Sequence, residues 1–180
     1  MKIIVINGRP RAGKDTFVEF CQKHCMWCLN ISTVDFVKDV ARYCGWDGEK
    51  TPENRKFLSD LKALLTEWDD VPFRKVGEAI IAFGSEMKIY DFDPDKDGIV
   101  FIHCREPEQI ERFKKELGAQ SLAILRGEDE DGEGETPSNT SDANVYNYNY
   151  DYYIPNEGTL QDLEDVAVRF LDGIGIKNLK

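Results

Sequence analysis

The feature that most limits how this chain can fold is a short apolar run that ends in a glycine-rich turn. Residues 1–6 read MKIIVI, and Asn7 and Gly8 follow them directly. A strand with apolar side chains on both faces is typical of a parallel sheet that helices cover on both sides. The beginning of the sequence therefore predicts a buried parallel strand and, with it, an α/β protein.

The remaining sequence repeats this alternation of strand and helix. Apolar runs and one alternating stretch of tyrosines predict further strands at residues 29–34, 98–103, 119–125 and 146–154. Apolar residues at helical spacing predict helices at residues 14–27, 34–43, 51–68, 75–88, 107–117 and 159–171. We therefore expect a single α/β domain over residues 1–180, with a parallel sheet of about five strands flanked by helices.

Composition narrows the kind of protein. The chain carries 23 basic and 34 acidic residues, a formal net charge of −11. This charge repels phosphates over most of the surface and argues against a protein dedicated to nucleic acid or to a membrane surface. No apolar run approaches the roughly 20 residues of a membrane span. The five cysteines are an odd number and no export signal is visible, so we expect reduced thiols and a cytoplasmic protein.

Residues 8–15 carry the motif that points to chemistry. They read GRPRAGKD and match G-x-x-x-x-G-K, the P-loop motif. The glycines let backbone N–H groups converge on phosphate oxygens, the following helix points its positive end at them, and the lysine neutralises the β- and γ-phosphates. We therefore predict a site for a triphosphate such as ATP, made by Gly8, Arg11, Ala12, Gly13, Lys14, Asp15 and Thr16. The alternative is a glycine-rich turn that binds no ligand.

Asp15 departs from the usual motif, in which a Ser or Thr at this position gives its hydroxyl to Mg²⁺. A carboxylate is repelled by a triphosphate unless a metal ion or its waters lie between them. We therefore predict that Asp15 and Thr16 hold Mg²⁺, and the choice of direct ligand between the two stays open.

Three segments together resemble a known family. The P-loop ending Gly13-Lys14-Asp15-Thr16, after a short strand, resembles that of phage-type deoxynucleoside monophosphate kinases and of animal-type phosphomevalonate kinases. Residues 151–160, DYYIPNEGTL, resemble the D-x-x-I-x-N-x-G-T-L ending of such kinases, and residues 105–108, REPE, are similar to their turn after the central strand. The resemblance covers both ends of the chain and is loose across residues 34–97.

The resemblance implies a P-loop NTPase of the nucleoside monophosphate kinase fold that uses ATP and Mg²⁺. The acceptor would be a small phosphorylated molecule, most simply a (deoxy)nucleoside monophosphate, and a phosphomevalonate-type or other small-molecule kinase is the alternative. Lys14, Arg105 and Arg126 would supply the positive charge that phosphoryl transfer needs, and Asn156 would lie beside the base. Residues 34–90 would form a helical acceptor lobe, with four candidate contacts: Asp35, Arg42, Arg55 and Arg74. Oligomeric state stays open.

One segment does not fit an active kinase of this fold. Residues 127–150 would form the lid, but residues 127–155 contain no Lys or Arg, and residues 128–135 hold six carboxylates. We expect residues 127–144 of this segment to be a mobile loop. Its carboxylates would oppose the charge on the phosphates, which keeps open a non-catalytic nucleotide-binding protein.

Three cysteines have the spacing C-x₃-C-x₂-C, which can hold an iron–sulfur cluster when it lies in a loop. They are Cys21, Cys25 and Cys28. If the helix that follows the P-loop extends to residue 27, the spacing places all three on one helical face. We therefore expect buried free thiols rather than a cluster or zinc.

Overall fold

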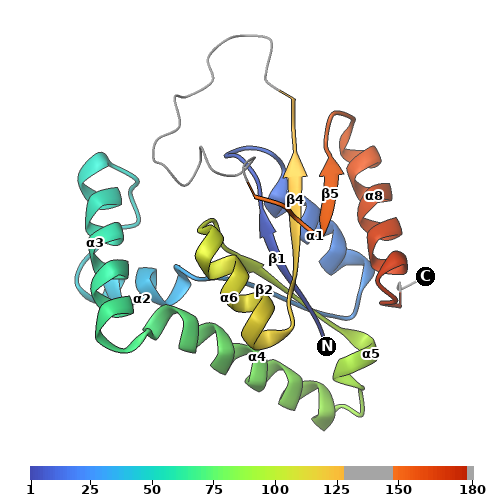
Figure 1. Ribbon diagram of the computed structural model, residues 1–180, viewed down its shortest axis with the longest axis horizontal. Coiled ribbons are helices and arrows are strands. Elements are labelled where there is room, and N and C mark those ends of the chain that lie inside the picture. The colour runs from blue at the N-terminus through green and yellow to red at the C-terminus, as the bar shows by residue number, and fades with distance from the viewer. Residues whose placement is uncertain (128–147, 178–180) are drawn as a thin grey trace.

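A five-stranded sheet, in which every strand runs parallel to its neighbours, forms the centre of the protein. The structure is a computed structural model and describes residues 1–127 and 148–177 (Figure 1). The strand order across the sheet is β2-β3-β1-β4-β5. The strands are β1 (Lys2–Asn7), β2 (Trp27–Ser32), β3 (Gly98–His103), β4 (Gln120–Leu125) and β5 (Tyr152–Pro155). The predicted α/β class with five parallel strands is confirmed.

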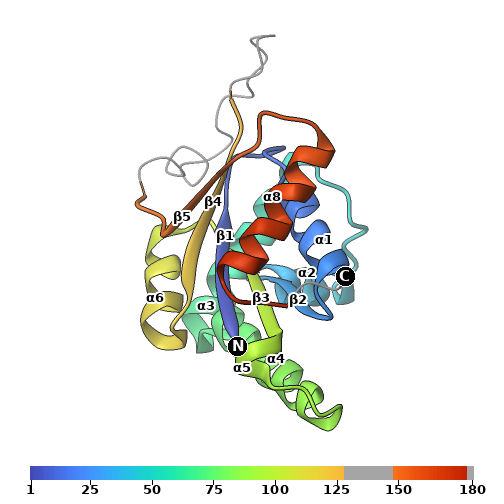
Figure 2. The ribbon, with the colours of Figure 1, turned by 90° about the vertical axis from the view of Figure 1, so that its right-hand side faces the viewer.

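Helices connect the strands and cover both faces of the sheet (Figures 1 and 2). They are α1 (Lys14–His24), α2 (Asp35–Tyr43), α3 (Pro52–Asp69), α4 (Val71–Ile89), α5 (Pro94–Asp97), α6 (Pro107–Leu117) and α8 (Leu160–Gly173). Thr51 and Thr159 cap α3 and α8 through their hydroxyls, and Asp162 completes a capping box in α8. Residues 34–90 hold α2, α3 and α4, with a non-helical connection over residues 44–51, and α4 begins at Val71 rather than at residue 75. No helix among the described residues has the length and apolar character that a membrane span needs.

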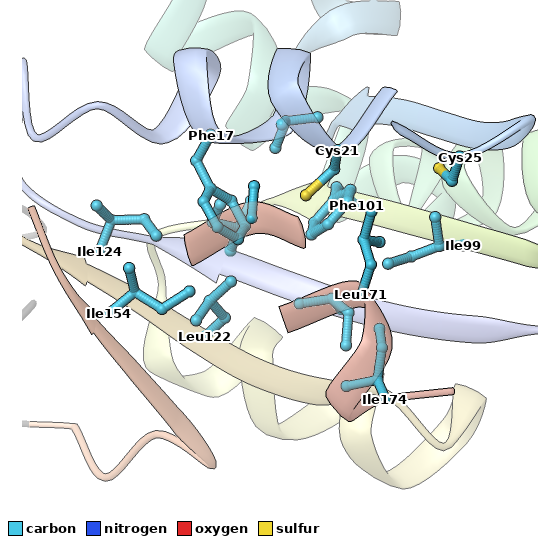
Figure 3. Close-up of a cluster of buried hydrophobic side chains, with 14 of the residues drawn as sticks. Phe17, Cys21, Cys25, Ile99, Phe101, Leu122, Ile124, Ile154, Leu171 and Ile174 are labelled. Carbon is cyan, nitrogen blue, oxygen red and sulfur yellow. The ribbon is translucent and has the colours of Figure 1, made fainter. Parts of the chain in front are cut away.

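Two apolar cores, one on each face, fix the sheet. Side chains alternate along β1, so Ile4 and Ile6 pack with α1 and α8, whereas Val5 packs with α4 and α6. Figure 3 shows the first core, in which Phe17 of α1 is fully buried against the sheet. Burial of a side chain of this size contributes about 1.5–3 kcal/mol. Because β1 is buried on both faces, the loop that follows it starts from a fixed point.

The topology creates a crevice at the carboxyl end of β1. The chain passes from β1 to one side of the sheet, where β2 and β3 lie, and then to the other side, where β4 and β5 lie. Ligands of open α/β sheets bind where the connections diverge in this way, at the carboxyl ends of the strands. Ile6 of β1 is in register with His103 of β3 at this edge. The loop after β1 therefore begins beside the end of β3.

The segment that holds three cysteines differs from the prediction. Helix α1 ends at His24, Cys25 caps it in an extended conformation, and Cys28 already lies in β2. Residue 27 is the first residue of β2 rather than the last residue of a helix. The ring of Trp27 packs against aromatic rings of α4 and of the turn that follows α4, and these contacts hold it there. The prediction that all three cysteines share a helical face was therefore wrong. Burial raises the pKa of the Cys21 thiol, the deepest of the three.

The last strand also differs from the prediction. β5 begins at Tyr152, not at residue 146. Tyr150 precedes it and is buried, because its ring packs edge-on against Tyr148 and Tyr153. Most of the predicted lid, residues 128–147, lies outside the described residues.

Candidate functional site

The loop between β1 and α1 closes around the ammonium group of Lys14. The Lys14 Nζ donates hydrogen bonds to the carbonyl oxygens of Gly8 and Arg9, each at 2.8 Å. Gly13, which precedes α1, has φ 92°, and Arg11 has φ 61°. A residue with positive φ next to one in the right-handed region turns successive backbone N–H groups toward one centre, the arrangement that binds anions. The loop therefore has the conformation that the motif predicts.

The turn between β5 and α8 supports this loop from the other side. Asn156 Nδ2 donates to the carbonyl oxygen of Ala12 at 2.9 Å, and the Asn156 backbone N–H donates to Leu125 O at 2.6 Å. A Cβ atom on Gly13 would lie 2.4 Å from Asn156 Nδ2, so only glycine fits there. The structure thus brings together two motifs that lie more than 140 residues apart, as the resemblance implies.

These elements enclose a pocket of about 320 Å³. It is lined by Arg11, Gly13, Lys14, Asp15, Thr16, Arg126, Asn156, Gly158, Thr159, Leu160 and Leu163. Helix α1 starts at this pocket, and its N-cap residue is Gly13, which has no side chain to cap the first turn. The first N–H groups of a helix without a cap need an acceptor, and a phosphate supplies one.

Positive charge gathers at the pocket although the protein is acidic. Arg11 and Arg126 line it together with Lys14, and in residues 1–127 and 148–177 neither arginine forms an ion pair. An unpaired guanidinium keeps its donors for a ligand. Arg105 follows β3 and does not line the pocket, so two of the three predicted catalytic residues are brought together there and one is not.

A buried network lies beneath the loop and was missed by sequence reasoning. Asn7 Oδ1 accepts from the Gly8 N–H at 2.8 Å, and Asn7 Nδ2 donates to the Tyr150 hydroxyl at 2.8 Å and to Arg105 O at 3.4 Å. Burial raises the pKa of Tyr150 to about 12, so the hydroxyl stays protonated. This network connects the start of the P-loop with the turn after β3 and the segment before β5.

His103 is the second residue that sequence reasoning missed. Its Nδ1 lies 3.7 Å from Asp15 Oδ1, and its Nε2 is buried with no hydrogen-bond partner in the described parts of the chain. Burial lowers the pKa of His103, so the imidazole is neutral near pH 7. Its position was the available signal, because it ends a buried strand, and ligands bind at strand ends.

The four predicted acceptor contacts do not line the pocket. They are Asp35, Arg42, Arg55 and Arg74. Arg42 is paired with Asp39 at 2.7 Å, and Arg74 is paired with Asp69 and Glu78, each at 2.9 Å. These are exposed ion pairs within or next to their own helices, which contribute little to stability. The role of these residues in acceptor binding stays a prediction.

Comparisons with known proteins show a fold. No family model and no curated protein matches the chain. Among solved structures, the tunicamycin resistance protein of Deinococcus radiodurans is similar with a TM-score of 0.53 and 12% identity, over 99% of this chain and 98% of that one. Dephospho-CoA kinase from Campylobacter jejuni has a TM-score of 0.48 and 14% identity, over 96% and 97% of the two chains. At such identities, likeness is informative about architecture alone, so this chain is a P-loop α/β protein whose activity must be argued from its site.

Proposed function

We propose that the protein transfers the γ-phosphoryl group of ATP to a small phosphorylated acceptor, a nucleoside or deoxynucleoside monophosphate. The observation that carries this proposal is a P-loop that closes around Lys14 and opens on a pocket at the start of α1. Two arginines line this pocket, and neither forms an ion pair within residues 1–127 and 148–177. The resemblance of the P-loop and of residues 151–160 to deoxynucleoside monophosphate kinases supports this choice of acceptor.

The chemistry requires little more than placement and charge. Phosphoryl transfer passes through a loose transition state, so positioning and positive charge do most of the work. The N–H groups at the start of α1 and the Lys14 ammonium would bind the β- and γ-phosphates. Arg126, at the end of β4, would meet the charge on the phosphoryl group as it moves, and Arg11 would hold the outer phosphates.

A divalent cation, Mg²⁺ by the resemblance, would neutralise phosphate charge when it is bound together with the nucleotide. The residues at the start of α1 fit such an ion. Asp15 and Thr16 supply oxygen ligands at the pocket. His103 Nδ1 lies 3.7 Å from Asp15 Oδ1, on the side of β3. A carboxylate beside a triphosphate also needs a cation between them.

One observation favours a second candidate, a protein that binds nucleotide and does not turn it over. Residues 127–155 contain no Lys or Arg, and the cations that line the pocket, Arg11, Lys14 and Arg126, lie outside this segment. If the transition state requires charge from that segment, ATP binds and no phosphoryl group moves.

Calorimetric titration with ATP and Mg²⁺ tests the site, and an ADP-formation assay over nucleoside monophosphates and phosphomevalonate tests the activity. Lys14→Ala should weaken ATP binding about 10- to 100-fold, because charge-assisted hydrogen bonds to phosphate are lost. Lys23→Ala is the matched control, since Lys23 lies on the same helix and pairs with Glu164. Equal ATP affinity in wild type and Lys14→Ala would remove the P-loop from the argument. Firm ATP binding without turnover for every acceptor would favour the second candidate.

A further inference from the structure

Helix α3 carries an apolar stripe that the described parts of the chain leave largely open to solvent. The stripe consists of Phe57, Leu61, Leu64 and Trp68, which lie within about 60° of one another around the helix. Phe57, Leu64 and Trp68 are 39%, 62% and 75% exposed, although the helix packs on α2 and α4. Figure 1 shows α3 at the outer edge of the molecule, away from the sheet. A row of large exposed apolar side chains that includes a tryptophan is typical of a contact surface for another protein.

The residues of this chain that the structure leaves undescribed do not have the composition to cover the stripe. Residues 128–147 carry seven carboxylates and no basic residue, and their large apolar side chains are those of Val145 and Tyr146. Residues 178–180 add one leucine. A segment this polar and acidic gains little from burial against four large apolar side chains. A matching apolar surface is therefore to be sought on a second molecule.

The spacing of the stripe suits a second copy of the same helix. Its four residues follow one another at intervals of four, three and four, an order that reads the same in both directions along the helix. A two-fold axis at the middle of the stripe therefore sets Phe57 against Trp68 of the second copy. The same axis sets Leu61 against Leu64 of the second copy. Intervals of four and three are those of a coiled-coil seam, and two-fold pairing is the commonest symmetry of protein assemblies.

Charged residues beside the stripe favour the antiparallel direction. Lys56, Asp60 and Glu67 lie on the same flank of the stripe and are exposed. Lys56 pairs with Asp60 at 2.5 Å, whereas Glu67 has no ion pair within residues 1–127 and 148–177. In the antiparallel pair, Lys56 and Glu67 of the second copy lie about 3 Å apart along the helix axis and on the same flank. A parallel pair would instead set each of these charges beside its own copy, which is repulsive.

We propose that α3 is a dimerisation surface, on which two copies of this chain pair through antiparallel α3 helices. The contact is separate from the P-loop pocket, because none of the four stripe residues lines that pocket. A helix of 18 residues is about 27 Å long, so a pair of them buries less area than the roughly 1,600 Å² of a standard interface. The dimer should therefore dissociate on dilution, with a Kd on the order of 1–100 μM.

Sedimentation velocity over about 1–300 μM protein, with a reductant present, measures the association. Wild type should change from monomer to dimer across this range. Leu64→Glu should raise the Kd at least about 30-fold, because it places a carboxylate in the seam. Ile81→Glu is the matched control, since Ile81 is 72% exposed on α4 and lies outside the stripe, and its Kd should stay within about threefold of wild type. Far-UV circular dichroism checks that both variants are folded.

Two outcomes of this experiment overturn the proposal. Wild type that stays monomeric at about 300 μM would show that a second copy does not cover the stripe, which leaves a different protein as its occupant. Equal weakening by Leu64→Glu and Ile81→Glu would show that the copies associate through another surface or through net charge.

A charge exchange tests the antiparallel direction. Lys56→Glu and Glu67→Lys should each raise the Kd about 10-fold, because like charges then face each other across the axis. The double variant restores opposite charges at both contacts, and its Kd should return to within about threefold of wild type. A double variant that associates no better than the single variants overturns the antiparallel pairing. All three variants change exposed side chains, so each remains available as a folded monomer for comparison.

Discussion

The P-loop and helix α3 differ in how they are held. On the P-loop side, β1 is buried on both faces, and three elements donate or accept hydrogen bonds around the loop. On the side of α3, the helix runs for 18 residues without one buried side chain. It packs on α2 and α4 and reaches the rest of the protein through the Lys62–Glu106 ion pair at 2.6 Å.

This difference separates a rigid site from an adjustable one. Charge that must meet a reacting phosphoryl group has to be held within a fraction of an ångström, which the P-loop side allows. Elements with few buried contacts lie at the low-stability end of a structure and are displaced at the smallest cost. Helix α3 is such an element, so we expect it to shift when an acceptor binds, while the P-loop keeps its conformation.

The sharpest way to break this comparison is to remove one arginine from each side. Arg126→Ala should lower kcat on the order of 10³-fold and change ATP affinity little, because the guanidinium acts on the transition state. Arg42→Ala is the counterpart on α2, where the arginine is already paired with Asp39. We expect less than about threefold loss of kcat there. Steady-state kinetics of ADP formation measures kcat for both variants. Equal losses of kcat would mean that the helical side supplies catalytic charge as well as the P-loop side.

Removal of the side-chain amide of Asn156, which supports the P-loop, should have the next largest effect on the site. Asn156→Ala leaves the Ala12 carbonyl without its donor in a buried place, which costs about 1–3 kcal/mol. We expect ATP affinity to fall about tenfold in calorimetry and the melting temperature to fall with it. Asn54→Ala is the control from α3, because the Asn54 amide bonds the exposed Glu49 carbonyl. A larger loss of ATP affinity in the control would contradict a rigid P-loop side.

A single hydroxyl tests the network under the loop. Tyr150→Phe keeps the buried ring and removes the acceptor of the 2.8 Å bond from Asn7. A neutral hydrogen bond is worth about 0.5–1.5 kcal/mol, so ATP affinity should fall about threefold. Tyr153→Phe is the control, because it also removes a hydroxyl that accepts a hydrogen bond, here from the Tyr150 N–H. The Tyr153 side chain is half exposed, and among the described residues no hydrogen bond joins it to Asn7. Identical ATP titrations for both variants would show that the network does not reach the site.

Sequence reasoning is most specific where one chemical requirement determines the residues. Phosphate binding needs glycines, a lysine and a helix start at fixed spacing, so Gly8, Gly13 and Lys14 could be assigned from the motif. The buried strand before them follows from its apolar run. Asn156 came from resemblance rather than from spacing, and the structure shows the physical reason, a bond to Ala12 O.

It failed where contacts are made across the sheet or at the surface. His103 faces Asp15 only because β3 is inserted beside β1, an order that local patterns do not encode. Tyr150 lies before β5 and not in it, so its alternation with other tyrosines was misleading. Helix α3 has apolar residues at helical spacing, yet Leu64 and Trp68 are 62% and 75% exposed. Periodicity predicts that a helix has an apolar face and not what covers that face.

The smallest effect concerns the ion pair that ties α3 to the turn before α6. Burial acts to raise the pKa of Glu106, but the charge and hydrogen bond of Lys62 outweigh it and hold that pKa below its usual 4.5. A lowered pKa means that the pair stabilises the fold above about pH 4.5, and that this stabilisation is lost as pH falls through the folded-state value. Both side chains are partly exposed, so the contribution is at most about 1 kcal/mol. Urea denaturation at about pH 7 and pH 3 should show Glu106→Gln less stable than wild type only at the higher pH. Asp60→Asn is the control, because Asp60 pairs with Lys56 at the exposed surface of the same helix, and this variant should match the stability of wild type at both pH values. If Glu106→Gln also matches wild type at both pH values, α3 is attached by its packing on α2 and α4 alone.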